Sequence, residues 1–573
     1  PGDTCWPSDA DFAALNATIS GHLLRGVPPA SVCYADQPNY DQSACEQVRM
    51  NWFNADFHAE YSVSISFPYW ADNPCPPIFP NGTSVTGDVD AGRKGCSIGK
   101  YPAYVVNATG YREVQAAFKF AARKGIRVNV KSTGISLQGR STAFGSLSIW
   151  TRYIKGIQIY SAFQAEKCAS AGSSAAAIVA AGETVRAIYE AAGERDMIVV
   201  AGLSQHVGIV GWVTGGGHGP LSSTYGMGVD NVLEVKMVTP NGDYLTANAC
   251  QNTDLFWAVR GGGGGTFGVI TEVTMKAFPS PTITTHDLSI AAQRSTTDST
   301  WWKLVAEIHS HLPSLKEGGL EGYIIMTPSV FTTTQTNTFT WTFSLYNRPN
   351  GTIESLLKPV IQFLDANNST ITYTTSITHP SSFLAHWLSG LGPEPVASSA
   401  VSSGSRLLPA SVFSSEDSIA AFATALENIS AHPSDAGPPI LQSHMIANSA
   451  NRGLNISLVS AWRDAVVHFV IGEGFADSVS HADAKVVYAR QTARTEFLRI
   501  MAPKSGAYLN ECDPFSPQWQ NDFWGDNYER LKRVKIGVDR TTALWCVSCV
   551  GGEGWVSKED GRLCKADTYI GQA

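Results

Sequence analysis

Residues 211–219 read GWVTGGGHG, and residues 260–270 read RGGGGGTFGVI. Because glycine has no side chain, such runs let the backbone approach a large planar or phosphorylated ligand closely. Flexible Gly/Ser linkers lack order-promoting neighbours, whereas apolar, strand-like segments flank these runs at 197–201, 233–238 and 269–273. The two runs therefore predict that an extended ligand lies along this backbone.

The size and charge of the chain limit the possible partners. Its 573 residues are too many for one hydrophobic core and indicate two or more domains. The net charge is −8 and 16% of residues are charged, so electrostatics do not favour nucleic acid or an anionic membrane. No apolar stretch reaches the roughly 20 residues that a spanning helix needs. We expect a small-molecule substrate, no nucleic-acid or membrane partner, and a monomer.

Glycosylation signals favour a secreted protein. The chain starts at Pro1 without Met, which is typical of a mature protein whose signal peptide has been removed. Eight Asn-x-Ser/Thr sequons occur, at Asn16, Asn81, Asn107, Asn350, Asn367, Asn368, Asn428 and Asn455. We therefore expect an extracellular glycoprotein.

Cysteine usage supports the same compartment. Five of the eleven cysteines lie within the first 96 residues, which favours disulfides. An odd total leaves at least one thiol unpaired or intermolecular. Cys546 and Cys549 form a CVSC motif that could be a redox or zinc pair, but no second pair or histidine cluster accompanies it, which favours a structural role.

A phosphate-binding loop is predicted after the first clear helix. Apolar residues recur at helical spacing over 111–124, Gly125 ends the helix, and 126–130 alternates as a strand, so the pattern is βαβ-like. The next residues, KSTGISLQGRS at 131–141, offer backbone N–H groups and hydroxyls that suit a pyrophosphate. No GxGxxG follows a first strand, which disfavours a nicotinamide enzyme.

The turn at 240–243 is typical of a hairpin.

These blocks resemble the flavoprotein oxidases of the vanillyl-alcohol oxidase (VAO) and p-cresol methylhydroxylase (PCMH) superfamily, in its berberine-bridge-enzyme-like branch. The resemblance is greatest to secreted fungal proteins labelled isoamyl alcohol oxidases. It spans nearly the whole chain and rests on the ordered blocks CWPSDADF, PPASVCY, KSTGISLQGRS, AGLSQHVGIVGWVTGGGHG, LFWAVRGGGGGTFGVIT, YLN and FWGDNY.

The resemblance implies an α+β fold with a two-part FAD-binding domain of the VAO type (PCMH-type) and an α+β substrate domain with an antiparallel sheet. Composition changes along the chain place the boundaries. We expect a disulfide-tied extension at 1–98, the FAD-binding domain at 99–280, the substrate domain at 281–500, and a C-terminal, berberine-bridge-like segment at 501–573 that returns to the FAD domain.

The cofactor implied is FAD, and no metal is expected. In many relatives a histidine and a cysteine bind the flavin covalently, and these positions fall on Ile135 and Ser204 here. Neither side chain can replace them, because isoleucine has no nucleophile and a serine hydroxyl is too weakly acidic. We therefore predict non-covalent FAD. The predicted cofactor-binding residues are Ser132, Thr133, Gly134, Ile135, Ser136, Gly139, Arg140, Ser204, Val207, Gly208, Gly211, Thr214, Gly215, Gly216, Gly217, Gly219, Ile270 and Asn510.

The predicted catalytic residues are Tyr508, His218 and His444. Tyr508 and Asn510 resemble the family's YxN pair, in which the tyrosine lies over the flavin ring. Alternatively, Tyr508 is an aromatic residue of an ordinary strand without a role in catalysis. A tyrosine pKa near 10 requires a histidine or cationic neighbour for it to act as a base. His218 lies between glycines that expose it to a ligand or let its ring turn into the core. His444 and His468 lie in strand-like segments of the expected substrate domain. They could face the flavin as bases or serve as structural histidines.

Two further positions bear on the chemistry. Arg260 could supply positive charge near the flavin or form an interior salt bridge. In relatives, a small residue three positions after the usual cysteine admits oxygen, and Val207 at this place is compatible with an oxidase.

Several functions stay open. The first is a secreted FAD oxidase that transfers hydride from an alcohol-type C–H to flavin N5 and reduces oxygen to hydrogen peroxide; a primary alcohol, a phenolic alcohol or a sugar could be the substrate. The second is an FAD dehydrogenase with another acceptor. The third is a catalytically silent binding glycoprotein, which the changes at Ile135 and Ser204 keep possible.

Overall fold

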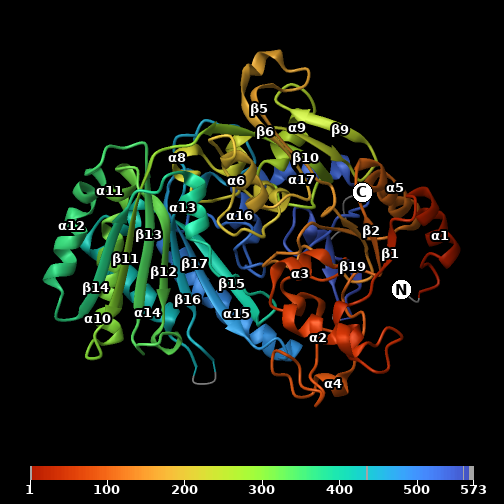
Figure 1. The fold of residues 1–573 in the computed structure, drawn as a ribbon, viewed down its shortest axis with the longest axis horizontal. Helices are drawn as coiled ribbons and strands as arrows, with labels where there is room; N and C mark the ends of the chain where they lie inside the picture. Colours follow the sequence, from red (N-terminus) through yellow and green to blue (C-terminus); the bar gives the residue numbers. More distant parts are fainter. Residues whose placement is uncertain (1–2, 434–435, 559, 567–573) are drawn as a thin grey trace.

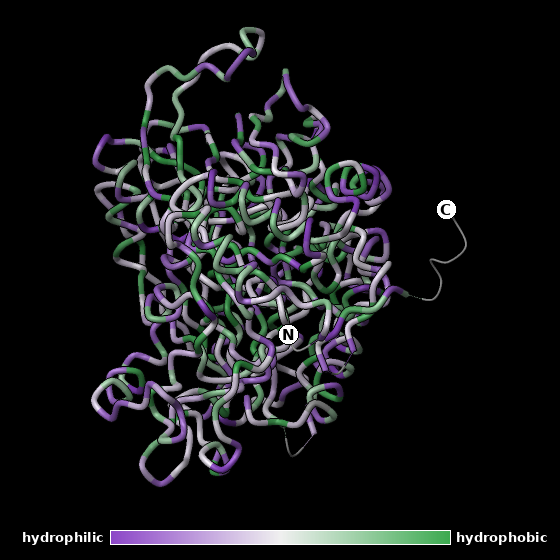
Figure 2. The backbone as a smooth tube through the Cα atoms, turned by 90° about the vertical axis from the view of Figure 1, so that its right-hand side faces the viewer, coloured by the Kyte–Doolittle hydropathy of each residue, from purple (hydrophilic) through white to green (hydrophobic). Residues whose placement is uncertain are grey.

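The structure is a computed structural model that describes residues 3–433, 436–558 and 560–566. Pro1 and the last seven residues of the predicted C-terminal segment lie outside the described residues. A seven-stranded sheet forms one side of the molecule, and the N-terminal segment lies on the opposite side (Figure 1). Hydrophilic and hydrophobic segments alternate along the loops that protrude at the top and bottom in Figure 2.

The described part of the N-terminal segment contains four short α-helices, the last being α4 (Ala91–Lys94), and two disulfides. Helices α1 (Asp9–Thr18), α2 (Gln42–Asn51) and α3 (Ala55–Glu60) begin after Ser8, Asp41 and Asn54, whose side chains cap the first backbone N–H groups. Disulfides join Cys33 to Cys45 and Cys75 to Cys96. The predicted disulfide-rich character of this segment is therefore present, with more helix than its loop-like composition suggested.

A small, mostly parallel sheet follows, in the order β1-β2-β4-β3. Helix α5 (Tyr111–Lys124) has the predicted bounds, because its apolar residues are buried along one face and Gly125 closes it in the left-handed conformation. The βαβ expectation needs one correction, since β4 lies between the two predicted strands and pairs with both. The strands are β1 (Leu23–Arg25), β2 (Tyr104–Asn107), β3 (Val128–Lys131) and β4 (Leu147–Trp150).

A six-stranded antiparallel sheet carries the glycine runs. Its main path is β5-β6-β10-β8-β9, and β7 also pairs with β10. The predicted turn at 240–243 joins β8 to β9 as an antiparallel hairpin, and a disulfide between Cys168 and Cys250 lies near the β5–β6 hairpin. The elements are β5 (Ile157–Gln164), β6 (Ser173–Ala180), α6 (Val185–Gly193), β7 (Met197–Val199), α7 (Ile209–Thr214), α8 (Ser222–Tyr225), β8 (Val232–Val238), β9 (Tyr244–Asn248), α9 (Thr253–Val259) and β10 (Val269–Pro279).

The seven-stranded antiparallel sheet has the order β14-β11-β13-β12-β16-β17-β15. One face packs against helices through buried apolar residues at alternate strand positions, such as Ile324, Met326 and Phe469. The opposite face packs towards the six-stranded sheet, and a two-stranded sheet of β18 (Trp555–Ser557) and β19 (Leu563–Lys565) completes the fold. The elements are β11 (Ile283–Ala292), α10 (Asp298–Ser310), α11 (Leu312–Glu317), β12 (Glu321–Thr327), β13 (Thr338–Tyr346), α12 (Thr352–Ala366), β14 (Ile371–Thr378), α13 (Phe383–Ser389), β15 (Ala400–Pro409), α14 (Glu416–Ser430), β16 (Ile440–Met445), β17 (Ala465–Phe475) and α15 (His481–Met501).

The C-terminal part packs back on the first half of the chain. Helices α16 (Trp519–Trp524) and α17 (Tyr528–Val538) follow α15, and Trp524 donates to the carbonyl of Gly261 in the second glycine run. Cys546 and Cys549 form a disulfide, so neither thiol is free to bind zinc, and the structural role stays a prediction. Among the described residues Cys5, Cys512 and Cys564 are free. No helix in the described ranges has the length and apolar character needed to cross a membrane.

Candidate active site and cofactor cavity

A cavity of ≈ 210 Å³ lies between the two smaller sheets and the C-terminal segment. Its walls come from 132–137 after β3, the start of α7, the second glycine run at 264–265, and the segments 508–511 and 545–546. The loop after β3 is anchored by Lys131, whose buried ammonium donates to the backbone carbonyls of His58, Ala59 and Tyr61. Segments far apart in the chain therefore meet around one space.

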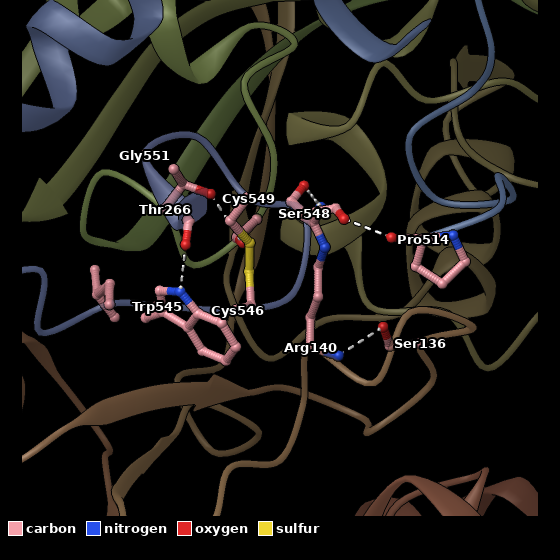
Figure 3. The surroundings of a disulfide bond; sticks show 12 residues. Ser136, Arg140, Thr266, Pro514, Trp545, Cys546, Ser548, Cys549 and Gly551 are labelled. Atoms are coloured by element: carbon pink, nitrogen blue, oxygen red, sulfur yellow. Dashed lines mark hydrogen bonds between the residues drawn. A yellow bond between two sulfur atoms is a disulfide. The ribbon is translucent and has the colours of Figure 1, made fainter. Parts of the chain in front are cut away.

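Most of the predicted cofactor-binding residues line this cavity. Gly211 faces open space, because a Cβ added there would meet no atom within 4 Å. The guanidinium of Arg140 lies beside the Cys546–Cys549 disulfide and donates to the carbonyl of Ser548 (Figure 3). The predicted residues that line the cavity are Ser132, Thr133, Gly134, Ile135, Ser136, Arg140, Val207, Gly208, Gly211, Ile270 and Asn510.

The later part of the first glycine run, 215–219, has a different role from the one predicted. A Cβ at Gly215 would lie 2.5 Å from Asn510, one at Gly216 2.8 Å from Leu458, and one at Gly219 1.8 Å from the carbonyl oxygen of Ala201. These glycines make room for protein atoms rather than for a ligand. Gly217 packs against Trp212 and Gly139 against Trp70 in the same way. Thr214 also lies outside the cavity lining. Its hydroxyl donates to the carbonyl of Val210, within the same helix.

Ser204 also lies away from the cavity lining. Its hydroxyl donates to a carboxylate oxygen of Glu394 at 2.5 Å, and the backbone N–H of Gln205 donates to the other oxygen. This position, where relatives carry a cysteine, is therefore engaged in a contact with the loop before β15. Ile135, at the position of the histidine, does line the cavity.

A second group of predicted residues meets on the inner face of the seven-stranded sheet. Tyr323 of β12 is directly opposite His444 of β16, which in turn is opposite His468 of β17. Directly opposite residues of neighbouring strands lie on the same face of a sheet. The three side chains therefore form a row, and all three are turned away from the helices that cover the other face.

His218 and Glu511 reach this row from two other parts of the chain. The indole of Trp212 donates to the carbonyl of His218 and fixes the end of the first glycine run. His218 Nε2 lies 3.1 Å from Glu511 Oε1, and His468 Nδ1 lies 3.6 Å from Glu511 Oε2. The structure thus brings together all three histidines proposed from the sequence.

Tyr508 connects this cluster to the cavity. Its ring lies edge-on to that of His218, with the centroids 5.0 Å apart, and it lines the cavity together with Asn510 and Glu511. The Asn510 side-chain amide donates to the Tyr508 hydroxyl at 2.9 Å. The predicted pair of tyrosine and asparagine is therefore a hydrogen-bonded unit in the cavity wall.

Burial sets the protonation of the cluster. It lowers the pKa of His444 to about 3 and holds the pKa of His468 well below its ordinary value, so both rings are neutral. Burial opposes ionisation of Glu511, but the neighbouring imidazoles, His218 first, lower its pKa to about 2. Burial, followed by the charge of Glu511, raises the pKa of Tyr508.

Glu511 was not predicted from the sequence, and Arg260 has neither of the two roles expected for it. Glu511 directly follows Asn510, and an acidic residue next to the YxN pair was the available signal. Arg260 neither lines the cavity nor forms an ion pair in the described part of the chain. Its guanidinium instead stacks on Phe256 at 4.0 Å and donates to the carbonyls of Phe256 and Asn455.

Comparisons with known proteins agree with this arrangement. Residues 102–248 match the family described as FAD binding domain, and residues 507–546 match the family described as berberine and berberine like. The chain is 32% identical to the VAO-type flavoprotein oxidase VAO615 of Thermothelomyces thermophilus, over 99% of this chain and 95% of that protein. It is 30% identical to the FAD-linked oxidoreductase ZEB1 of Gibberella zeae, over 99% of this chain and 94% of that protein. The chain belongs to the VAO-type flavoproteins, in their berberine-bridge-like branch.

The fold is that of a VAO-type flavoprotein throughout. The crystal structure of MtVAO713 from Myceliophthora thermophila C1 matches with a TM-score of 0.90 at 27% identity, covering 99% of both chains. The mixed architecture with an antiparallel sheet, expected from the sequence, is therefore confirmed. The protein is an FAD-linked oxidoreductase.

The cavity of this VAO-type flavoprotein fits FAD on two observations. Gly211 leaves space that a side chain would fill, and the buried Nε and Nη1 of Arg140 have no hydrogen-bond partner in the described structure. Backbone N–H groups, hydroxyls and a guanidinium are donors that suit a pyrophosphate. Residues 132–136, Arg140 and Gly211 would therefore hold the cofactor. When bound, FAD accepts a hydride from a substrate C–H bond.

Proposed function

We propose that the protein is a secreted FAD-dependent oxidase that acts on an alcohol-type substrate and reduces oxygen to hydrogen peroxide. One observation carries the proposal: the Glu511 carboxylate lines the cavity and is hydrogen-bonded from behind by His218. Oxidation of an alcohol requires a group that accepts the hydroxyl proton while the C–H bond is broken. A carboxylate held at the cavity wall is placed for this task.

The residues of segment 508–511 have different roles in the proposed reaction. Glu511 accepts the proton of the substrate hydroxyl. Its hydrogen bond with His218 holds the carboxylate in place and shares the change in charge between the carboxylate and the imidazole. Tyr508 donates a hydrogen bond rather than accepting the proton, because its burial disfavours the phenolate. Asn510 holds the Tyr508 hydroxyl in place. His444 supports the cluster from β16 without touching the cavity lining.

We also propose that FAD is held without covalent bonds. Ile135 lines the cavity and has no nucleophilic atom, and Ser204 is outside the lining with its hydroxyl bonded to Glu394. Acid precipitation tests this directly. All of the flavin should appear in the supernatant, whereas yellow colour in the pellet would contradict the proposal.

Oxygen as the acceptor and an extracellular location complete the proposal. Val207, the residue expected to admit oxygen, lines the cavity. Disulfides are typical of oxidising compartments. Sequon asparagines at the surface, which glycosylation requires, are Asn81, Asn350, Asn368, Asn428 and Asn455.

The test is a substrate screen with two readouts. Purified protein is mixed with primary alcohols, phenolic alcohols and oligosaccharides, and hydrogen peroxide is measured in air. The same panel is run without oxygen while flavin bleaching is followed. Peroxide formation supports an oxidase; bleaching without peroxide on readmission of air supports a dehydrogenase. Flavin-free protein that cannot be reconstituted with FAD would instead support a binding glycoprotein.

A further inference from the structure

The rings of His218, His444 and His468 form a nearly equilateral triangle. Their centroids are 5.6 Å, 5.5 Å and 5.5 Å apart. One nitrogen from each ring and one carboxylate oxygen of Glu511 all lie within 4.8 Å of one another. Three imidazoles and a carboxylate that converge in this way form a four-atom donor set. The four separate segments of sequence that carry these residues do not reveal it.

Several nitrogens of the triangle have no partner in the described structure. Both ring nitrogens of His468 and Nδ1 of His444 are buried without a hydrogen bond. His468 is fully buried and His444 is 5% exposed. Buried polar atoms are almost always satisfied, so each exception calls for a physical reason. A bound ligand that accepts lone pairs would supply it.

The outer contacts of two rings hold them in orientations suited to ligation. His444 Nε2 lies 3.1 Å from the Gln442 side-chain oxygen, an acceptor, so Nε2 carries the proton and Nδ1 presents a lone pair to the cluster. His218 Nδ1 lies 3.4 Å from the Tyr323 hydroxyl, which leaves Nε2 facing Glu511. In metal sites a ligating histidine is almost always oriented by a hydrogen bond from its other nitrogen.

The negative charge of Glu511 has no balancing Lys or Arg side chain in the described structure. Within the described ranges, no Lys or Arg forms an ion pair with Glu511, whose carboxylate instead lies next to Nε2 of His218 and Nδ1 of His468. The carboxylate is partly buried, with 26% of its side chain exposed, and pairing or a metal ion commonly removes the cost of holding such a charge away from water. A cation at the centre of the triangle would neutralise it.

We propose that His218 Nε2, His444 Nδ1, His468 Nδ1 and one oxygen of Glu511 bind a divalent metal ion of the zinc class. Three imidazole nitrogens and one carboxylate oxygen form a donor set that Zn²⁺ accepts in tetrahedral geometry, with bonds of about 2.0–2.2 Å. Such bonds place the donors roughly 3.4 Å apart. Nε2 of His218 lies 3.1 Å from one oxygen of Glu511, Nδ1 of His468 lies 3.6 Å from the other, and the four donors lie within 4.8 Å of one another. The side chains would therefore move inward when the ion binds.

The ligands of this site are defined without a substrate, and two of them, His218 and Glu511, also belong to the proposed oxidation site. It would join the seven-stranded sheet, the first glycine run and the C-terminal segment through one ion. Glu511 would use one oxygen on the metal and keep the other at the cavity wall. The ion would thereby fix the carboxylate that we assign to proton acceptance.

Metal content tests the proposal without any activity measurement. Purified, FAD-containing protein is analysed by elemental mass spectrometry, then treated with a chelator and titrated with Zn²⁺ against a chromophoric chelator. We expect one Zn²⁺ ion per chain and thermal stabilisation on its addition. Substitution by Co²⁺ should give ligand-field bands of a tetrahedral site at longer wavelengths than the flavin. Absence of metal together with no saturable Zn²⁺ binding would overturn the proposal.

Variants locate the ion in the cluster. His468→Phe removes a ligand while keeping a ring, and should weaken Zn²⁺ binding more than the roughly 10- to 100-fold expected for the outer-contact variant Gln442→Ala. The control is His309→Gln, since His309 is equally buried but both its nitrogens have partners, the carbonyl of Val305 and the hydroxyl of Ser443. It should bind Zn²⁺ as the wild type does.

His468→Phe also separates a metal site from a merely unsatisfied histidine. If the nitrogens bind metal, the variant loses the stabilisation by Zn²⁺ but retains its flavin. If they bind nothing, removing two unsatisfied polar atoms raises the melting temperature and leaves Zn²⁺ binding unchanged. The second result would overturn the proposal, as would equal Zn²⁺ affinity in His444→Gln and the wild type.

Discussion

Nε2 of His218 lies 3.1 Å from Oε1 of Glu511, although the two residues are 293 positions apart in the chain. The contact joins the end of the first glycine run to the segment that lines the cofactor cavity. It places a buried imidazole directly behind a carboxylate that faces the cavity. The activity of the protein should therefore depend on this pair.

Replacing Glu511 with glutamine tests the carboxylate. Glu511→Gln keeps the shape and the contact with His218 but removes the proton acceptor, so kcat should fall by about 100-fold or more. Stopped-flow measurement of flavin reduction gives this rate for the substrate found in the screen. The control is Glu427→Gln on the exposed face of α14, which should be unaffected. Unchanged flavin reduction in Glu511→Gln would exclude the assigned role.

Restoring the covalent positions should have unequal effects. Ile135 lines the cavity, so Ile135→His should place a nucleophilic ring beside the cofactor and attach part of the flavin covalently. Ser204 lies outside the lining and is bonded to Glu394, so Ser204→Cys alone should attach none. Flavin fluorescence of denatured protein in a gel measures both. Attachment in Ser204→Cys but not in Ile135→His would contradict the assigned positions.

Two glycines should respond to alanine in opposite ways. A Cβ at Gly211 meets no protein atom, and the residue lies in α7, so Gly211→Ala should preserve or raise stability by about 0.5–1 kcal/mol while lowering FAD content. A Cβ at Gly219 lies 1.8 Å from the Ala201 carbonyl oxygen, so Gly219→Ala should cost about 3 kcal/mol or prevent folding. Denaturant unfolding and the ratio of flavin to protein absorbance distinguish the two.

The buried histidine His309 should make stability fall in mild acid. Burial lowers its pKa to about 4, below the value near 6.5 in the unfolded chain. Between these pH values the unfolded chain binds a proton that the folded chain does not, so the free energy of unfolding decreases as pH falls through this window. The full effect is about 3 kcal/mol.

Unfolding in urea at several pH values, with His309→Gln as the matched variant, checks this expectation. The variant should lose less stability between pH 6.5 and 4 than the wild type, because glutamine does not titrate in that range. Parallel curves for the two proteins would mean that His309 contributes nothing to the acid sensitivity.

Local patterns predicted local structure well. The apolar spacing of Tyr111–Lys124 and the glycine after it fixed helix α5 at its observed bounds, and the turn at 240–243 joins two strands as expected. The position of β4 between β2 and β3 was not predictable in this way, because parallel pairing is decided by long-range packing.

The candidate site was only partly predictable for a related reason. A glycine signals that something approaches the backbone, but not what approaches it; at Gly215 the neighbour is Asn510 rather than a ligand. The loop at 132–136 was recognised because all its donors are consecutive in the chain. Glu511 was missed because its partner His218 comes from a distant block, and only the fold joins them.

The hydrogen bond from the Val128 N–H to the Ala543 carbonyl has a consequence for biosynthesis. Trp545 and Cys546 complete the wall of the same cavity, and Trp545 is 418 positions after its partner Arg127. At about 5–20 residues per second, a ribosome needs roughly 20–80 s to make the chain between them. The loop that follows Val128 therefore stays exposed to solvent until the last part of the chain has left the ribosome. Cofactor loading is accordingly a post-translational event, and a nascent chain released early has no enclosed place for FAD.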